Sequence, residues 1–163
     1  MGAYKRIIVP LDGSPLAEEV LPHAETLASL CQAEVALVQV VPLVNQVLNM
    51  GLAGGPDVGP YPPAHIEALT KAMEAEVERA KAYLEHTAER LRRKGLRVST
   101  QVRRGDAGEE IVAAAREGQA DLIAISTHGR SGLSRLVFGS VAETVIRQAG
   151  VPVLVIKPAG KKR

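Results

Sequence analysis

The residues best suited to chemistry lie between positions 126 and 140, where glycine, arginine and serine side chains are gathered. Glycines lack a β-carbon and allow backbone N–H groups to approach an anion closely. Ser140 opens an amphipathic stretch that predicts a helix, and the start of a helix offers unpaired N–H groups and a positive dipole end. The glycines are Gly129, Gly132 and Gly139, and the arginines that could neutralise phosphate charge are Arg130 and Arg135.

A carboxylate, Asp12, stands at the other end of the chain in the sequence Pro10-Leu11-Asp12-Gly13. Acidic side chains accept hydrogen bonds from ribose hydroxyls in nucleotide-binding α/β proteins. If the fold brings Asp12 to the 126–140 segment, the two together predict a nucleotide site. Plainer interpretations stay open: the glycines as turn residues, Ser140 as a helix cap, and Asp12 as a residue that caps the following helix.

Several other chemistries lack their motifs. The sequence contains no GxxxxGKS/T loop, no GxGxxG after its first strand, no GxSxG elbow and no HExxH pair. His128 is a lone loop histidine rather than a metal ligand, and the single cysteine, Cys31, has no partner for a disulfide or a CxxC pair. No acid–base pair stands out as catalytic, so we expect at most slow hydrolysis of a bound nucleotide.

Apolar strand-like segments alternate with helical periodicity along the chain. The segment 42–63 is rich in proline and glycine and predicts a long irregular insertion within one domain. Ser14 with Pro15, Asp106 with Glu109, and Ser140 with Glu143 have the types expected at helix starts, the last pair as a capping box. The expected strands are 4–10, 34–41, 97–104, 121–127 and 152–157, and the expected helices are 15–31, 64–94, 106–118 and 140–149.

This alternation predicts an α/β fold: an open parallel five-stranded sheet with helices on both faces. Segment 97–104 alternates apolar and polar side chains, which places it at an edge. When the strands are numbered as they occur in the chain, their natural order across the sheet is then 3-2-1-4-5. The order reverses between 4–10 and 121–127, and ligands bind at such a point outside the carboxyl ends of the strands.

The last strand indicates a partner. Residues 153–156 are all apolar, although the order above leaves them at the other edge of the sheet. An uncovered apolar edge invites pairing with another chain. We therefore expect a homodimer through the last strand, Val151 to Pro158.

The stretches from Ile7 to Ala24 and from Ser126 to Pro158 resemble the universal stress protein superfamily, and the order of elements matches across the whole chain. The ATP-binding branch is marked by glycine, two residues, glycine, nine residues, then glycine with serine or threonine. Gly129 and Gly139-Ser140 fit this motif, whereas Ser126 stands where its first glycine would be. The resemblance implies a Rossmann-like, adenine nucleotide α-hydrolase-like fold, one domain over 1–163 with 42–63 as its variable loop, and dimerisation through the last strand.

The resemblance also implies roles for single residues. Asp12 and Val40 would contact adenine and ribose, and backbone N–H groups with the Ser140 hydroxyl would hold the phosphates. A divalent cation such as Mg²⁺ often accompanies a bound triphosphate, although the sequence shows no dedicated carboxylate cluster for it. The nucleotide-binding residues expected are Pro10, Leu11, Asp12, Val40, Ser126, His128, Gly129, Arg130, Gly132, Gly139, Ser140, Val141 and Ala142.

Composition limits the other partners. The 163 residues carry a net charge of +2 and only 2% aromatic side chains, which argues against nucleic acid binding. No basic start precedes an apolar run, and no stretch of about 18 apolar residues is present, so we expect a cytoplasmic protein without a membrane partner.

Three hypotheses follow for function. The first is an ATP-binding, or adenine nucleotide-binding, universal stress protein with a regulatory or stress-response role. The second is a nucleotide-free dimeric interaction module of the same fold, which Ser126 favours. The third is an enzyme acting on ATP, for which the sequence shows no catalytic constellation.

Overall fold

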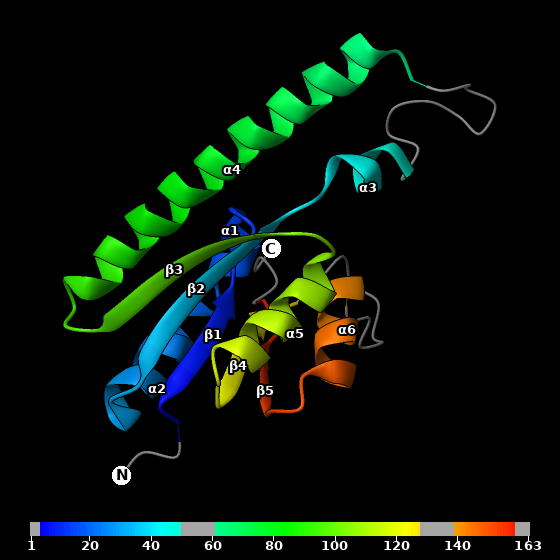
Figure 1. Ribbon diagram of the computed structural model, residues 1–163. Coiled ribbons are helices and arrows are strands. Elements are labelled where there is room, and N and C mark those ends of the chain that lie inside the picture. Colours follow the sequence, from blue (N-terminus) through cyan, green and yellow to red (C-terminus); the bar gives the residue numbers. More distant parts are fainter. Residues whose placement is uncertain (1–3, 50–60, 128–138, 159–163) are drawn as a thin grey trace, which may run out of the picture.

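Five strands form one parallel sheet in the order β3-β2-β1-β4-β5 (Figure 1). The computed structural model describes residues 4–49, 61–127 and 139–158. The strands are β1 (Arg6–Pro10), β2 (Glu34–Val41), β3 (Arg97–Arg104), β4 (Leu122–Ser126) and β5 (Val153–Ile156). Every predicted strand is present and the predicted order is confirmed, so strand order reverses between β1 and β4.

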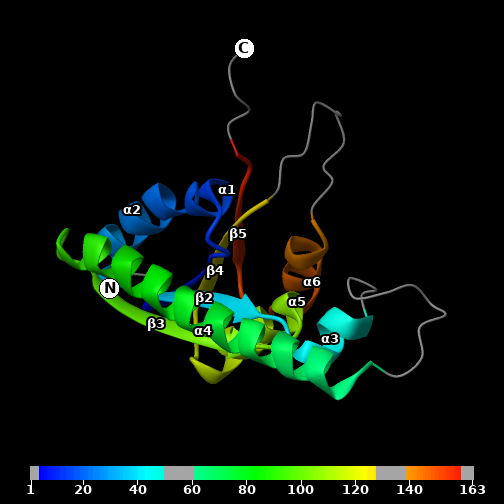
Figure 2. The same cartoon turned by 90° about the horizontal axis from the view of Figure 1, so that it is seen from above.

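Helices cover both faces of the sheet, as the alternating pattern predicts (Figure 2). One face packs against α1, α2 and α4, and the other packs against α5 and α6. The helices among the described residues are α1 (Pro15–Glu18), α2 (Leu21–Cys31), α3 (Val44–Asn49), α4 (Pro63–Arg92), α5 (Ala107–Glu117) and α6 (Ser140–Gln148).

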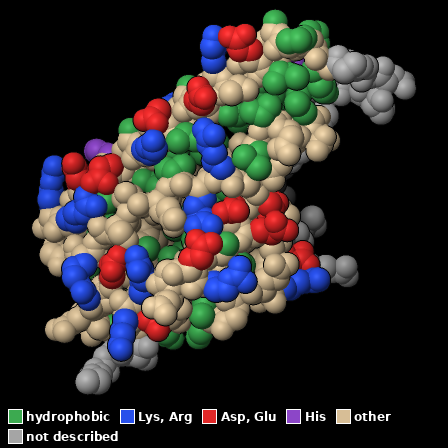
Figure 3. Space-filling model, in the orientation of Figure 1, with side chains coloured by type: hydrophobic (Ala, Val, Ile, Leu, Met, Phe, Trp, Pro, Cys, Tyr) green, Lys and Arg blue, Asp and Glu red, His purple; other side chains and the backbone are tan. Residues whose placement is uncertain are grey.

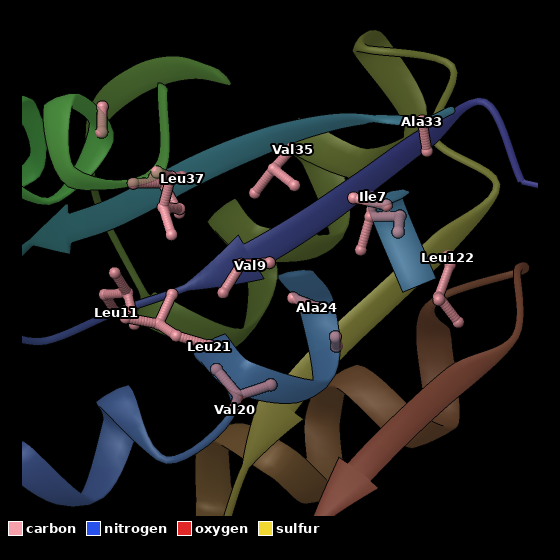
Figure 4. Packing of buried hydrophobic residues seen from close by; sticks show 14 of the residues in the cluster. Ile7, Val9, Leu11, Val20, Leu21, Ala24, Ala33, Val35, Leu37 and Leu122 are labelled. Carbon is pink, nitrogen blue, oxygen red and sulfur yellow. The ribbon is translucent and has the colours of Figure 1, made fainter. Parts of the chain in front are cut away.

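The core is aliphatic and divided by the sheet. Ile7 and Val9 of β1 point to the face of α2 and α4, where Leu84 is fully buried. Ile8 points to the opposite face, where it packs with Ile111 of α5. Side chains of successive strand residues alternate between faces, so a central strand with helices on both sides must be apolar throughout. Figure 4 shows residues from β1, β2 and α2 meeting in the first of these clusters.

The predicted helix 15–31 is wrong as one element, because the structure has two helices there. α1 ends at Glu18, and α2 begins at Leu21 with Pro22 in its first turn. Proline lacks an N–H, and its ring clashes with the carbonyl of the residue four positions earlier, which is Glu18. The chain therefore bends between the two helices, and the short α1 stays beside the end of β1.

The segment 42–63 is not wholly irregular, since α3 lies within it. The Leu43 N–H donates to the side-chain Oε1 of Gln46 at 2.7 Å and thereby satisfies a donor at the start of that helix. Residues 50–60 of this segment lie outside the described part of the chain.

Only the carboxyl-terminal half of the long helix α4 packs into the core. Its buried residues all lie between Ala80 and Leu91, whereas Leu69, Met73 and Val77 of the predicted apolar stripe remain half-exposed. Its amino-terminal half extends past the sheet and faces α3 (Figure 1). Figure 3 shows hydrophobic side chains gathered over this end of the molecule.

Candidate functional site

A pocket of about 390 Å³ opens where strand order reverses, at the carboxyl ends of β1, β2 and β4. Every predicted site residue that the structure describes lines it: Pro10, Leu11, Asp12, Val40, Ser126, Gly139, Ser140, Val141 and Ala142. The others, His128, Gly129, Arg130 and Gly132, lie outside the described residues. The turn after β1, the end of β4 and the start of α6 therefore face a common space, which the nucleotide hypothesis requires.

The turn after β1 is held by its own side chains. The Ser14 N–H donates to Asp12 Oδ1 at 2.8 Å, and the Ala17 N–H donates to Ser14 Oγ at 3.1 Å. Gly13 between them has a φ of +82°, which glycine adopts without strain. Ser14 is thus the N-cap of α1, as predicted, while Asp12 orders the turn before it and remains exposed on the pocket wall.

Strand β2 runs past the end of β1 and presents backbone groups to the pocket. The paired register of the two strands ends at Pro10 opposite Val38, and the Leu11 N–H donates to the Val38 carbonyl at 2.8 Å. Backbone groups of alternate strand residues point to the same side. The N–H and carbonyl of Val40 therefore point toward the space beyond β1, where they form a donor–acceptor pair.

The inner wall is apolar and was only partly found from sequence. Residues that line the pocket without having been predicted are Ala17, Val38, Ala107, Ile111, Ile125 and Thr127. The spacing in the sequence could have indicated three of these residues. Val38 lies two residues before the predicted Val40 on a strand, so both side chains are on one face. Ala107 and Ile111 lie one helical turn apart and share one face of their helix. The apolar side chains from β2, β4 and α5 form a slot that suits a flat apolar ring, while Ser126 and Thr127 at the end of β4 add hydroxyl groups.

At the end of β4, Ser126 stands at the pocket with a buried hydroxyl. Its Oγ has no hydrogen-bond partner among the described residues. The next residue, Thr127, donates its N–H to the carbonyl of Ile156 at 2.9 Å, which continues the pairing with β5.

The start of α6 differs from the capping box predicted for Ser140 and Glu143. The N-cap is Gly139, without a side-chain cap, and Ser140 is the first helical residue. Because the helix begins one residue earlier, Glu143 falls too late to reach back, and its carboxylate instead pairs with Arg147 at 2.8 Å. The first N–H groups of α6 therefore receive no capping oxygen from Gly139, and they lie at the pocket, where an anion would satisfy them.

Two helices that carry one wall of the pocket pack at very close range. A β-carbon added to Gly108 of α5 would lie 2.6 Å from the β-carbon of Thr144 in α6. Glycine at position 108 thus permits the approach that sets Ser140 and Ala142 opposite Ala107.

Within the described residues, no group of three His, Cys, Asp or Glu side chains could hold a metal ion. The same part of the chain contains no helix that is long and apolar enough to cross a membrane.

The chain is similar to known proteins along nearly its whole length. A model of the universal stress protein family matches residues 3–157. Universal stress protein MJ0531 from Methanocaldococcus jannaschii is 34% identical over 159 residues, which cover 98% of this chain and 85% of that protein. The solved structure of protein MJ0577 from the same organism has a TM-score of 0.77 at 28% identity, covering 98% of this chain and 99% of the other. A universal stress protein from Archaeoglobus fulgidus, solved in complex with dAMP, has a TM-score of 0.64 at 25% identity, covering 95% and 99%.

Proposed function

The chain belongs to the universal stress protein family, and we propose that it binds an adenine nucleotide, ATP in particular, in the pocket at the end of β1, β2 and β4. The observation that carries this proposal is the junction of an apolar slot with the uncapped start of α6. A base needs the first and a phosphate group needs the second. The complex of the Archaeoglobus fulgidus relative with dAMP supports an adenine nucleotide as the ligand.

Each part of the pocket has a proposed role. The adenine ring packs between the apolar side chains of β2 and α5, and the backbone N–H and carbonyl of Val40 hydrogen-bond to its polar edge. Asp12, exposed at the rim, accepts hydrogen bonds from the ribose hydroxyls. The backbone N–H groups of Ser140 and Val141, with the Ser140 hydroxyl, bind the phosphates.

The segment 128–138 lies outside the described residues, and we propose from its sequence that Gly129, Arg130 and Gly132 complete the phosphate site. The described residues offer no carboxylate cluster for Mg²⁺. A cation that accompanies ATP would then be coordinated mainly by the phosphates and water, which is common for Mg²⁺.

The proposed role is regulatory rather than catalytic. Among the described residues that line the pocket, Asp12 is the one carboxylate, and it accepts a hydrogen bond from the Ser14 N–H that orders the turn. Strand β5 is apolar in all four positions, half-exposed and at the sheet edge. We propose that it pairs with β5 of a second copy, so that a dimer carries two nucleotide pockets and presents their state to a partner in a stress response.

A second candidate is the nucleotide-free dimeric module, and Ser126 is the observation that favours it. Its side chain stands where the ATP-binding motif has glycine, and its buried Oγ has no partner among the described residues. Only the replacement of the motif glycine favours the empty module. The unpaired hydroxyl argues for the first proposal, because a bound nucleotide could satisfy it, whereas an empty pocket would leave it unpaired at a cost.

Isothermal titration calorimetry with ATP, ADP, AMP and GTP separates the two candidates. We expect binding of the adenine nucleotides and weaker binding of GTP, because the Val40 donor–acceptor pair matches the adenine edge. Absence of heat together with an unchanged melting temperature at millimolar ATP and Mg²⁺ would reject the nucleotide proposal and favour the dimeric module.

A further inference from the structure

Helix α4 contacts the short helix α1, which lies beside the pocket, through the carboxylate of Glu18. The Tyr83 hydroxyl of α4 donates to Glu18 Oε1 at 2.9 Å. On the same face of α4, Arg90 Nη1 lies 3.6 Å from Glu18 Oε2. Side chains of α4 therefore contact both carboxylate oxygens of Glu18. Tyr83 is 65 positions away from Glu18 in the sequence.

Glu18 is linked to the pocket through the backbone of α1 and the hydrogen bonds of the turn before it, including the one that its own N–H donates to the Ser14 carbonyl at 3.3 Å. Asp12 accepts from the Ser14 N–H, and Ser14 Oγ accepts from the N–H of Ala17, the neighbour of Glu18. Asp12 and Ala17 both line the pocket. A displacement of Glu18 would thus be felt at two residues of the proposed nucleotide site.

Helix α1 cannot hold this position alone. It has four residues, and none of them is buried. A helix of one turn has almost no stability of its own, so contacts with the rest of the protein fix its place. The contacts from Tyr83 and Arg90 to Glu18 supply such a fixation.

We propose that Tyr83 is a positioning residue for the nucleotide pocket, acting through Glu18 on the turn that carries Asp12 and Ala17. This inference rests on the proposed adenine nucleotide binding. It makes α4 energetically coupled to the pocket, and the coupling is reciprocal: a change in the Tyr83–Glu18 bond alters nucleotide affinity, and nucleotide alters the bond.

The electrostatics at Tyr83 suit this role. Burial of the ring, followed by the nearby Glu18 carboxylate, raises the pKa of the Tyr83 hydroxyl well above its usual range, and the charge of Asp12 acts in the same direction. The hydroxyl therefore remains protonated and able to donate to Glu18 at physiological pH.

The test compares Tyr83→Phe and Glu18→Gln with Tyr61→Phe as the matched control. Tyr61 is also half-buried but lies just before the first residue of α4, Pro63, and its ring stacks on that of His65 with centroids 5.4 Å apart. ATP affinity is measured by calorimetry, beginning with the wild-type protein. We expect Tyr83→Phe to weaken binding roughly two- to tenfold, as for the loss of one hydrogen bond that supports the bound conformation. Tyr61→Phe leaves affinity unchanged.

A second readout separates positioning from general stability. The chain has three tyrosines, so protein labelled with ¹³C at tyrosine Cζ gives three assignable resonances. We expect ATP to shift the Tyr83 resonance and to leave that of Tyr61 in place. In Glu18→Gln, whose neutral side chain accepts more weakly, the ATP-induced shift of Tyr83 is reduced. This variant also decides the matter if Tyr83→Phe does not fold.

The outcomes are distinct. If wild-type protein binds no adenine nucleotide, both the proposed function and this inference fail. If wild-type protein binds ATP and both Tyr83→Phe and Glu18→Gln bind it with wild-type affinity, the inference alone is overturned. A lowered melting temperature with unchanged affinity and an ATP-insensitive Tyr83 resonance would likewise assign the bond to stability only.

Discussion

The contact between α5 and α6 allows a prediction of both stability and binding. Gly108→Ala places a methyl group 2.6 Å from Thr144 Cβ and 2.7 Å from its Cγ2. Carbon atoms pack at about 3.5–4.0 Å. Rotation of the threonine side chain does not relieve the overlap, because its β-carbon is fixed to the backbone. The two helices must therefore separate by about 1 Å.

The expected cost follows from two opposing effects. Overpacking in a tight interior costs about 1–3 kcal/mol. Alanine is a better helix former than glycine by up to about 1 kcal/mol, which offsets part of this cost. We expect a net loss of about 1 kcal/mol, and a melting temperature lower by about 3 °C for a chain of this size. Because α6 carries Ser140 and Ala142 on the pocket wall, ATP affinity should fall as well.

Thermal and urea unfolding measure the loss, and a compensating change provides the control. The double variant Gly108→Ala with Thr144→Gly has its glycine in α6 instead of α5. The alanine methyl group then meets no β-carbon, and the number of helical glycines is unchanged. We expect it to be more stable than the sum of the single changes by at least about 1 kcal/mol. If Gly108→Ala is as stable as wild type, or if the two changes are additive, the close helix contact does not have the role assigned to it.

Three further predictions test other parts of the molecule. Gly139→Ala, at an ordinary φ and with no atom of the described residues within 4 Å of the added carbon, should lower the melting temperature only slightly, because alanine is a weaker N-cap than glycine. It should weaken ATP binding about tenfold, and calorimetry showing wild-type affinity would contradict the phosphate site. The N–H groups of Lys5 and Arg6 donate to the Asp121 carboxylate and lower its pKa. The contribution of Asp121 to stability is therefore present above the unfolded pKa of 3.8, and it declines as the pH falls through the lower pKa of the folded state. Asp121→Asn should therefore lower the melting temperature at pH 7 but much less at about pH 2, and an equal loss at both pH values would refute the ionic origin. Val155→Lys places a charge on the edge strand β5 and should shift the mass measured by light scattering from dimer to monomer; a wild-type protein that is monomeric at micromolar concentration would contradict the β5 interface.

Local sequence patterns were sufficient for the sheet. Continuous apolar runs marked the central strands, and the alternation in 97–104 placed β3 at an edge, where its residues are half-exposed or exposed. The site segments could be predicted because the carboxyl ends of β1 and β4 are fixed by the strand order alone.

Features that depend on distant packing were not predictable in this way. The helix break near Glu18 was signalled by Pro22, but helical periodicity on both sides hid it. The N-cap of α6 is Gly139 rather than the predicted Ser140, because serine is acceptable both as an N-cap and as the first helical residue. The Gly108–Thr144 contact joins residues whose proximity no local pattern records.

The most direct test of the nucleotide pocket is a crystal structure of the protein grown with saturating ATP and Mg²⁺. We predict density for adenine beside Val40, for ribose at Asp12 and for phosphates at the first N–H groups of α6. A pocket that stays empty under these conditions, or a nucleotide bound elsewhere on the surface, would contradict the account.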